Sequence, residues 1–422
     1  MARVVVYSMA HRGDVFPFVP VASELSRRGH DVRFVVPREF HSIMGSEPFR
    51  TVHSGTDFGP STLDAHGAYL ARWGMRLGGA MLLRLYFGTF TIPHLAELFM
   101  AVDAEIASAD LVVAHPAASL VAAMSCERRG VPWIVGDLFP MLVPTNRVPP
   151  AGMPNLGPGM NRRMWSLARS RAAGRAGGAP AFVDFRARLG LGSDDWNLLD
   201  ARLSPFGNLA LSSPLYSPAQ PDWPTNYRLT GFTSWAGADD GAIPDEIMTF
   251  LDGGDPPVIV TLGSSAASAR PELFEVIGNA LRAVGRRGLH LTSNQAIADR
   301  TRNALADESQ GVWPFSPLAP LLPRAEAIVH SGAHGTNALA MQAGLPSLII
   351  PCLFDQLWHG RRQVELGTGI LLRKPSRAEE AIKQLIRDSA IRARAAAFGR
   401  ELRGEDGTTA AVDAIAAFLA SG

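Results

Sequence analysis

The stretch 326–344 has the order strand, turn and helix, and this order constrains the fold more than any other feature of the chain. EAIVH is a short apolar run that is typical of a buried strand. SGAHG is small and glycine-rich, so the backbone can turn sharply there and come close to a ligand. TNALAMQAG predicts a helix that begins at Thr336 and ends at Gly344. Such a unit is expected in an open α/β sheet.

The turn after this strand offers several groups to an anion. Backbone N–H groups at a helix start are unpaired, and the helix dipole favours negative charge beside them. A second apolar strand, PSLIIP, follows and leads to the polar pair Asp355–Gln356. Open α/β sheets bind ligands at the carboxyl ends of their strands, so these neighbours suit a phosphate joined to a polyol. The polar and glycine residues of the turn are His330, Ser331, Gly332, His334, Gly335 and Thr336.

The wider segment resembles the donor-sugar signature of the UDP-glycosyltransferase superfamily in its bacterial form. That signature reads roughly F-x-P-H-x-x-L-L-P-R, then H-H-G-G-x-G-T, then G-x-P, then D-Q. This chain has F-S-P-L-A-P-L-L-P-R from Phe315, H-S-G-A-H-G-T from His330, G-L-P from Gly344, and then Asp355–Gln356. Four blocks in one order and spacing are far more specific than a lone GxGT. The departures from the signature are Leu318 for His, Ser331 for the second His and Ala333 for Gly.

The resemblance implies the GT-B arrangement, in which two Rossmann-like α/β domains face each other across a cleft. It also implies roles for single residues. His330 and the N–H groups of Gly335 and Thr336 would stabilise a departing diphosphate without a metal ion. Asp355 and Gln356 would bind the hydroxyl groups of the sugar, although an isolated Asp355 reads equally well as a helix cap. No Asp-x-Asp motif is present, and no cofactor beyond the nucleotide sugar is expected.

Two further parts of the donor site rest on weaker signals. Phe315 lies where plant relatives place a Trp that stacks on the base, and Trp313 is a neighbouring alternative. Ser264 and Ser265 follow the strand PPVIVTL in a predicted Gly-Ser loop, where they could meet a phosphate or simply form an ordinary turn. The stretch 337–341 lacks the acidic residue that holds the ribose in plant relatives. That lack suits a dTDP-sugar and also permits a UDP-sugar.

The chain opens with a second strand–loop–helix unit. RVVVY predicts a buried strand, SMAHRGDVFP a loop, and FVPVASELSRRG an amphipathic helix before the strand HDVRFVVP. The loop resembles the first loop of the same superfamily, which implies that Asp14 activates the acceptor hydroxyl. His11 is a competing base. His115 ends the strand DLVVAHP, and it is either a partner of Asp14 or an ordinary polar residue at a strand end.

Composition bounds the class of protein. A chain of 422 residues suits two domains, and 47% apolar residues supply ample core material. The net charge of +1 argues against nucleic acid as the main partner, and two cysteines are too few for a disulfide framework or a Cys-based metal site. No signal peptide is predicted, and no uncharged apolar run reaches the roughly 20 residues of a spanning helix, so we expect a cytoplasmic protein.

The remaining sequence predicts the domain organisation. We expect an acceptor-binding domain over 1–215, a linker over 216–245, a nucleotide-sugar-binding domain over 246–390, and helices over 391–422 that return to the first domain. The apolar stretch 54–108 predicts either helices packed on the sheet or the wall of an acceptor cleft. The arginine-rich stretch 160–175 predicts either a solvated helical arm or a contact with an anionic membrane.

The function implied by the resemblance is inverting, metal-independent transfer of a sugar from a UDP- or dTDP-sugar to a hydroxyl of a lipophilic small molecule. Two alternatives belong to other classes. A GT-B protein without turnover could bind and activate another glycosyltransferase, which Leu318 and Ser331 make conceivable. A nicotinamide-dependent oxidoreductase would need G-x-G-x-x-G after the first strand, where this chain has S-M-A-H-R-G. The oligomeric state is not predicted.

Overall fold

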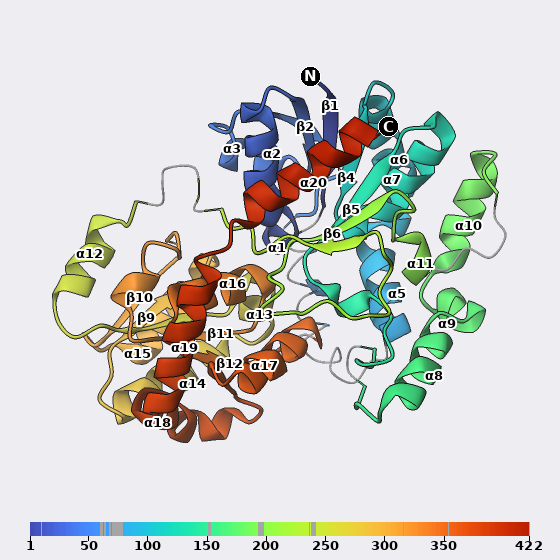
Figure 1. Cartoon of the computed structure of the whole chain (residues 1–422). Coiled ribbons are helices and arrows are strands. Elements are labelled where there is room, and N and C mark those ends of the chain that lie inside the picture. Colours follow the sequence, from blue (N-terminus) through green and yellow to red (C-terminus); the bar gives the residue numbers. More distant parts are fainter. Residues whose placement is uncertain are drawn as a thin grey trace. The chain divides into compact units, whose positions relative to one another are not determined.

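The computed structural model describes residues 1–9, 11–59, 62, 65–66, 69, 79–150, 153–192, 198–235, 237, 242–314, 316–352 and 354–421. The chain divides into two compact units (Figure 1). Unit 1 comprises Met1–Gly59, Leu77–Ala238 and Glu405–Gly422, and unit 2 comprises Pro60–Arg76 and Asp239–Gly404. Each unit contains one parallel sheet accompanied by helices, which confirms the predicted α/β class.

The sheet of unit 1 has the strand order β3-β2-β1-β4-β5-β6-β7. All its strand pairs are parallel, and the register sets Tyr7 on β1 opposite Ala114 on β4. The central strands read as nearly continuous apolar runs because both faces of a parallel sheet are covered. The strands are β1 (Arg3–Tyr7), β2 (Asp31–Val36), β3 (Arg50–His53), β4 (Leu111–Ala114), β5 (Trp133–Asp137), β6 (Gly207–Ala210) and β7 (Tyr227–Leu229).

The helices of unit 1 include one from the far end of the sequence. Residues of α20 join the buried core under α2 and β1, and Arg28 of α2 donates to Asp413 of α20 at 2.5 Å (Figure 1). The helices are α1 (Arg12–Val15), α2 (Val19–Arg27), α3 (Glu39–Ile43), α5 (Gly79–Phe90), α6 (Leu95–Ile106), α7 (Pro116–Arg129), α8 (Pro158–Ala168), α9 (Arg171–Ala176), α10 (Ala179–Arg188), α11 (Leu198–Ala201) and α20 (Gly407–Ser421).

One helical stretch, Ala80–Ile106, is long and apolar enough to cross a membrane by length and composition alone. The sequence had predicted no such span. In unit 1 this stretch is α5 and α6 joined by a short 3-10 turn at Ile92–His94. The apolar window of this stretch is 39% buried, and its buried residues include Phe90 and Leu98 at 0% exposure. A single helical stretch of this kind is weak evidence for a membrane span.

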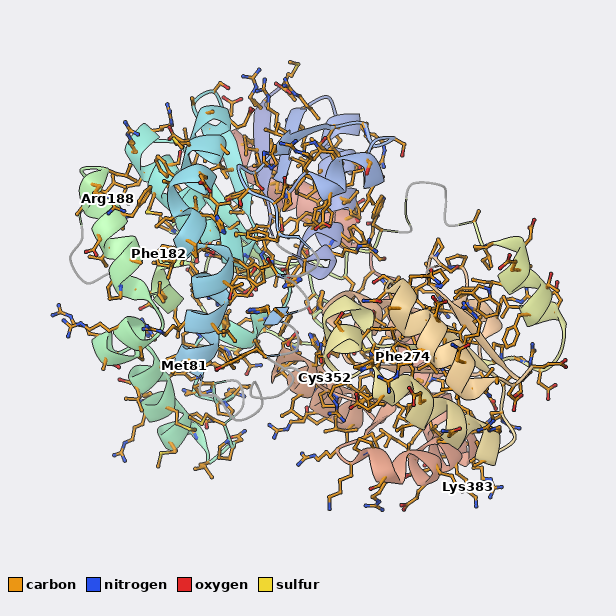
Figure 2. The ribbon with its side chains drawn as sticks, turned by 180° about the vertical axis from the view of Figure 1, so that it is seen from behind. Met81, Phe182, Arg188, Phe274, Cys352 and Lys383 are labelled. Atoms are coloured by element: carbon orange, nitrogen blue, oxygen red, sulfur yellow. The ribbon has the colours of Figure 1, made fainter. Side chains whose placement is uncertain are left out.

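The sheet of unit 2 has the order β10-β9-β8-β11-β12-β13, again with parallel pairs throughout. His330 at the end of β11 lies opposite Thr261 at the end of β8. Phe274 of α14 is fully buried in the core under this sheet (Figure 2). The strands are β8 (Val258–Thr261), β9 (Gly288–Leu291), β10 (Gln310–Trp313), β11 (Ala327–His330), β12 (Ser347–Ile349) and β13 (Gly369–Leu371).

The helices of unit 2 pack closely on its sheet and on one another. They are α12 (Asp245–Asp252), α13 (Gly263–Ala269), α14 (Glu272–Ala283), α15 (Gln295–Leu305), α16 (His334–Ala343), α17 (Phe354–Leu366), α18 (Ala378–Arg387) and α19 (Ser389–Leu402). Helix α19 approaches the end of α16 closely. A Cβ atom on Gly399 would lie 2.5 Å from Cα of Gly344 and 2.8 Å from the carbonyl oxygen of Met341.

Four segments differ from their predicted form. The loop after β1 contains α1, and the Gly-Ser loop after β8 is the first turn of α13. The stretch predicted as a linker contributes β7, so the sheet of unit 1 extends beyond residue 215. Of the terminal helices, α19 stays in unit 2 against α16, and only α20 belongs to unit 1. The predicted linker, 216–245, is rich in proline, tryptophan and glycine. Such residues occur in turns inside a domain as readily as in linkers.

The contact between Gly399 and Gly344 makes a stability prediction. Gly399→Ala should destabilise unit 2 by about 1–3 kcal/mol, because backbone atoms block the new methyl group and cannot move aside cheaply. Urea unfolding followed by circular dichroism measures the change. Gly88→Ala in α5 is the matched control, because a Cβ atom there meets nothing within 4 Å. The control should be neutral or stabilising by up to about 1 kcal/mol. Equal effects of the two substitutions would contradict the assigned helix contact.

Candidate functional site

The carboxyl ends of β1 and β4 form the point where the sheet of unit 1 changes its direction of winding. From β1 the chain builds outward through β2 and β3, and it then returns to the other side of β1 as β4. Loops leave such a point in opposite directions, so the groups they carry surround an open position. Asp14 follows β1 in α1, and His115 follows β4 directly. Nε2 of His115 lies 3.6 Å from Oδ1 of Asp14.

His115 is a buried neutral imidazole whose tautomer is fixed by its surroundings. It is the N-cap of α7, and its Nδ1 accepts a hydrogen bond from the backbone N–H of Ala117 at 3.2 Å. Burial lowers the pKa of His115 to about 3, and the charges of His11 and Arg202 act in the same direction. A nitrogen that accepts a hydrogen bond carries no proton, so the proton is on Nε2 and faces Asp14. His115 can therefore orient the Asp14 carboxylate, but it is not a base at neutral pH.

The backbone of Asp14 is held in place by its neighbours in the chain. The hydroxyl of Ser8 donates to the carbonyl oxygen of Asp14 at 2.7 Å, and the N–H of Asp14 donates to the carbonyl oxygen of His11 at 2.9 Å. The Asp14 side chain stays about one-fifth exposed. His11 precedes it by one helical turn, half-buried, with its ring edge-on to Phe90 at 5.3 Å. The structure thus brings all three predicted catalytic residues to one switch point.

Sequence reasoning named only a stretch, 54–108, for the surroundings of this corner, and the structure identifies individual rings within it. Tyr86 and Phe90 lie one turn apart on α5, with ring centroids separated by 5.1 Å. Phe58 packs edge-on to Phe90, also at 5.1 Å. Burial raises the pKa of the Tyr86 hydroxyl well above its usual value, with a further contribution from the Asp14 charge. An aromatic, weakly polar environment therefore adjoins Asp14. The i, i+4 spacing of Tyr86 and Phe90 was the available signal.

A buried ion pair supports the same edge of the sheet. Asp137 at the end of β5 accepts hydrogen bonds from the Tyr227 hydroxyl at 2.9 Å and from Nη1 of Arg202 at 3.2 Å. Burial raises the pKa of Asp137, and Arg202 opposes that rise. Both side chains of the pair are less than one-tenth exposed. Arg202 carries positive charge into the neighbourhood of His115, which helps to keep that imidazole neutral.

The carboxyl ends of β8 and β11 form the corresponding switch point of unit 2. His330 ends β11 and is fully buried. Its Nδ1 accepts a hydrogen bond from the N–H of Gly332 at 3.0 Å, so its proton is on Nε2. That Nε2 atom is buried and has no hydrogen-bond partner among the residues that the structure describes. Burial lowers the pKa of His330 to about 3. The residue is therefore a neutral hydrogen-bond donor with an unused N–H.

The helix after this strand begins two residues earlier than the sequence predicted, at His334 and not at Thr336. Its N-cap, Ala333, has no side chain that could accept a hydrogen bond, so the N–H groups of the first turn receive no side-chain cap. Gly332 adopts a φ of +92°, and a Cβ atom there would lie 2.9 Å from the carbonyl oxygen of Gln356. A Cβ atom on Gly335 would meet nothing within 4 Å, so the space before the helix is open.

Two further imidazoles adjoin His330. His334 opens α16, and its ring lies 5.5 Å from that of His359 on α17. Both rings are buried, with exposures of 6% and 0%. Burial lowers the pKa of His359 well below its usual value, and repulsion from His334 and His330 adds to this effect. Sequence reasoning predicted His334 and missed His359. Its position three residues after Gln356 in the next helix was the only signal.

Asp355 and Gln356 open α17 at the next strand end, as predicted. Oε1 of Gln356 accepts a hydrogen bond from the N–H of Cys352 at 2.8 Å, which secures the loop between β12 and α17. Asp355 is partly buried, and burial raises its pKa to about 6, although the backbone N–H groups of Gln356 and Asp355 oppose the rise. At neutral pH the carboxylate form prevails, and it accepts hydrogen bonds.

The other predicted donor residues are less well defined. Ser331 is buried in the turn beside His330. Ser264 and Ser265 lie in the first turn of α13, but the structure does not describe their side chains. Phe315 lies outside the described residues. Trp313 is not a free platform for a base, because it packs edge-on to Phe250 at 5.2 Å within a buried cluster.

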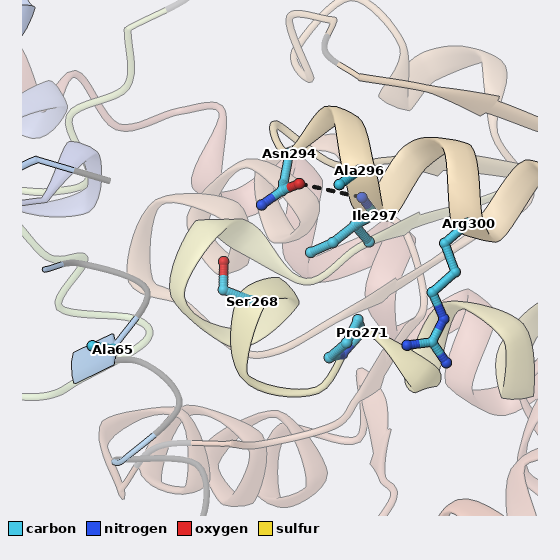
Figure 3. Close-up of a pocket in the computed structure, with 7 residues that line it drawn as sticks. All are labelled: Ala65, Ser268, Pro271, Asn294, Ala296, Ile297 and Arg300. Carbon is cyan, nitrogen blue, oxygen red and sulfur yellow. Dashed lines mark hydrogen bonds between the residues drawn. The ribbon is translucent and has the colours of Figure 1, made fainter. Parts of the chain in front are cut away.

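A pocket of about 460 Å³ lies between Ser268 and Pro271 on one side and the first turn of α15 on the other (Figure 3). Asn294 caps that helix, because its Oδ1 accepts a hydrogen bond from the N–H of Ile297 at 3.2 Å. The pocket is lined by Ala65, Ser268, Pro271, Asn294, Ala296, Ile297 and Arg300. Sequence reasoning did not predict it. Over the residues that the structure describes, no three His, Cys, Asp or Glu side chains are grouped as a metal site requires.

Comparison with known proteins agrees with this geometry. The family described as Erythromycin biosynthesis protein CIII-like, C-terminal domain, matches residues 295–417. Glycosyltransferase GtfE of Amycolatopsis orientalis is 28% identical over 97% of this chain and 96% of its own length. O-mycaminosyltylonolide 6-deoxyallosyltransferase of Streptomyces fradiae is 27% identical over 96% of this chain and 94% of its own length. The chain is a glycosyltransferase, and these relatives agree with the resemblance to the UDP-glycosyltransferase superfamily.

Solved structures identify the fold of this glycosyltransferase. Glycosyltransferase VinC in complex with dTDP superposes with a TM-score of 0.70 at 18% identity, over 100% of both chains. The predicted GT-B fold is confirmed by this likeness. It says nothing by itself about the substrates of the present enzyme, because many functions share one fold.

The neutral imidazole of His330 predicts how stability depends on pH. Its pKa is lowered to about 3 in the folded glycosyltransferase, against 6.5 for an ordinary histidine. Between these values the unfolded chain binds more protons, so stability falls as pH falls below about 6.5. The native protein should lose about 2 kcal/mol through His330 between pH 7 and pH 5.

Urea unfolding of the native protein and of His330→Asn at both pH values tests this. The variant should lose about 2 kcal/mol less over the same interval, while buried histidines away from this site, such as His290, contribute equally to both proteins. If the two proteins lost the same amount of stability, His330 would already be protonated or exposed in the folded state.

Proposed function

We propose that this glycosyltransferase moves a sugar from a dTDP- or UDP-sugar to a hydroxyl of a lipophilic small molecule, with inversion at the sugar carbon and without a metal ion. The observation that carries the proposal is the unused Nε2–H of His330, buried beside an uncapped helix start at the switch point of unit 2. A dissociating diphosphate is the group that this arrangement suits best.

In the proposed reaction the acceptor oxygen attacks the anomeric carbon while the bond from that carbon to the diphosphate oxygen breaks. The electron pair of the broken bond stays on the diphosphate. Nε2–H of His330 and the first-turn amides of α16 stabilise its charge. A single displacement of this kind inverts the configuration. The donors are neutral and fixed in advance, so no metal ion is needed to balance the departing charge.

The proton of the acceptor hydroxyl passes to the Asp14 carboxylate. An isolated carboxylate is a weak base toward an alcohol, but it needs to take the proton only as the new bond forms. His115 orients the carboxylate through its Nε2–H, at 3.6 Å in this structure. The rings of Phe58, Tyr86 and Phe90 provide the apolar surroundings in which a lipophilic acceptor is favourably bound.

The names of the relatives narrow the proposed substrates. The deoxyallosyltransferase of Streptomyces fradiae acts on a mycaminosyl-tylonolide, and VinC was solved with dTDP. By analogy, the proposed donor of the present enzyme is a dTDP-sugar. The proposed acceptor is a polycyclic or macrocyclic natural product. The stretch 337–341 supports a deoxyribose nucleotide, because it offers no carboxylate to a ribose hydroxyl: Asn337 is buried and accepts a hydrogen bond from Gln363 at 2.8 Å.

The alternative is a partner protein that binds a nucleotide sugar but does not turn over. Incubation of the purified chain with dTDP-sugars and a panel of macrolide and polyphenol acceptors separates the two functions. Release of dTDP that requires an acceptor supports the enzyme. Binding of dTDP with no turnover under any of these conditions would favour the partner function.

Asp14→Asn tests the base. The variant should lose 10²- to 10⁴-fold in kcat with little change in dTDP binding, because the amide cannot accept the proton. Assays are run with EDTA present, which should leave the native rate unchanged. His11→Ala is the comparison, because His11 is the competing base one helical turn away and should retain most of the rate. Full turnover by Asp14→Asn together with loss of turnover by His11→Ala would reverse the assignment.

Gly335→Ala tests the diphosphate site. The new methyl group would enter the open space before α16, so dTDP binding should weaken at least tenfold, as measured by calorimetry. Stability should hold or rise by up to about 1 kcal/mol, because alanine is the better helix residue. Gly332→Ala is the contrasting variant and should lose stability as well as binding, because of its φ of +92°. Native affinity for dTDP in Gly335→Ala would place the diphosphate elsewhere.

A further inference from the structure

The segment between Asp137 and Asp184 in unit 1 carries charge of one sign only. It contains no Asp or Glu and no Lys, and its charged residues are six arginines: Arg147, Arg162, Arg163, Arg169, Arg171 and Arg175. The whole chain has a net charge of only +1, so this segment is a local concentration and not an average property. A solvated surface usually mixes both signs, and a run without acids suggests an anionic partner.

The outer face of α8 combines one of these charges with exposed apolar side chains. Met160, Arg163 and Leu167 follow one another at spacings of three and four residues, which places them on one face. All three are exposed, Leu167 by 68%. Arg162 precedes Arg163 in the helix and is also exposed. This face carries none of the packing that holds the helix, so its composition is not explained by the fold.

The opposite face of α8 fixes the helix to the loop before it. Trp165 is buried, and its indole N–H donates to the carbonyl oxygen of Val148 at 2.8 Å. Asn161 is buried and donates to the carbonyl oxygen of Asn146 at 3.0 Å. The described part of this loop exposes further apolar side chains, including Leu156 at 62%. Loop and helix are therefore held together as one piece that presents apolar side chains on its outside.

The neighbouring elements extend this surface. Helix α9 follows after a sharp turn and packs against α5, whose exposed Met81 lies beside α8 and α9 in Figure 2. Arg169 forms an ion pair with Asp200 at 2.9 Å. Over the described residues, no ion pair engages Arg162, Arg163 or Arg175. We call the following set the docking surface: Met81, Arg147, Val148, Met153, Leu156, Met160, Arg162, Arg163, Leu167, Arg171 and Arg175.

We propose that the docking surface binds the headgroup region of an anionic phospholipid bilayer. Exposed Leu and Met side chains gain free energy by entering the headgroup boundary, and arginines beside them pair with lipid phosphates. Each basic residue near an anionic bilayer adds to the attraction, so four or more give useful binding even at physiological salt. Flexible apolar side chains interspersed with like charges suit a fluid surface better than an acidic protein, which would offer fixed partners.

The docking surface shares no residue with the Asp14 corner or with the α16 turn, so its proposed role does not depend on the proposed reaction. Binding to a bilayer would hold the enzyme at the membrane. A lipophilic acceptor concentrates in bilayers, and an enzyme held at the bilayer would meet it there. The binding would be peripheral and reversible, because the docking surface presents single exposed apolar side chains between arginines.

Vesicle co-sedimentation of the full chain tests the proposal. Binding to vesicles of 30% phosphatidylglycerol in phosphatidylcholine should be strong in 50 mM salt, weak in 500 mM salt, and weak to pure phosphatidylcholine. Arg162→Glu with Arg163→Glu should lower the partition coefficient at least about tenfold. Leu156→Ser with Leu167→Ser should also weaken binding, and the residual binding should depend more steeply on salt.

The matched control is Lys383→Glu with Arg387→Glu on α18 of unit 2, which changes the net charge by the same amount (Figure 2). These side chains are exposed, and the control should bind vesicles like the native protein. Unchanged thermal unfolding and dTDP binding of each variant exclude misfolding. Absence of native binding to the anionic vesicles in low salt would overturn the proposal, as would equal losses in the arginine variant and the control. Binding to soluble polyglutamate but not to vesicles would assign the surface to an acidic protein.

Discussion

The parallel winding of the two sheets is the constraint on which the rest of this molecule depends. In each unit the chain starts in the middle of the sheet, builds outward to one edge, and returns to build the other half. Parallel pairing places every strand's carboxyl end on the same edge of the sheet, and only at the return point do successive loops diverge. Asp14 and His115 meet at one such point, and His330 with the start of α16 occupies the other. The chemistry is therefore confined to two positions that the topology defines.

Both positions use the same local device. His115 and His330 each follow or end a switch-point strand, and each turns its Nδ1 back to accept the N–H of the residue two places later. This bond satisfies a backbone donor where the strand gives way to a turn or helix, and it fixes the proton on Nε2. Burial then lowers the pKa of both imidazoles to about 3. One structural solution thus produces a neutral donor in each unit. The first faces a carboxylate, and the second has no hydrogen-bond partner within the described parts of the chain.

Much of the local structure at both switch points could be predicted from the sequence, because glycines indicate where the backbone turns and apolar runs indicate buried strands. Strand β11 was predicted from the apolar run EAIVH, and the end of α16 was predicted from Gly344. The position of Asp14 after β1 was predicted from the H-R-G-D loop. The start of α16 was misplaced by two residues because Thr336 is a better cap by propensity than Ala333, which the fold uses instead. His359, Tyr86 and Phe90 could not be assigned to a site, since their proximity to it is set by packing between elements distant in sequence.

The neutrality of His330 explains how a buried site can await an anion at little cost to stability. A permanently charged imidazolium at 0% exposure would need an equally buried counter-charge, and the described turn supplies none beside its Nε2. A neutral N–H has a much smaller desolvation cost, and its direction is already set by the bond from Gly332. When negative charge develops in front of it, the interaction strengthens without any reorientation, which is the condition under which a dipole favours a transition state over a ground state. The same reasoning accounts for Ala333 at the N-cap. A Ser or Asp there would satisfy the first-turn amides from within the protein and would compete with the departing group for them.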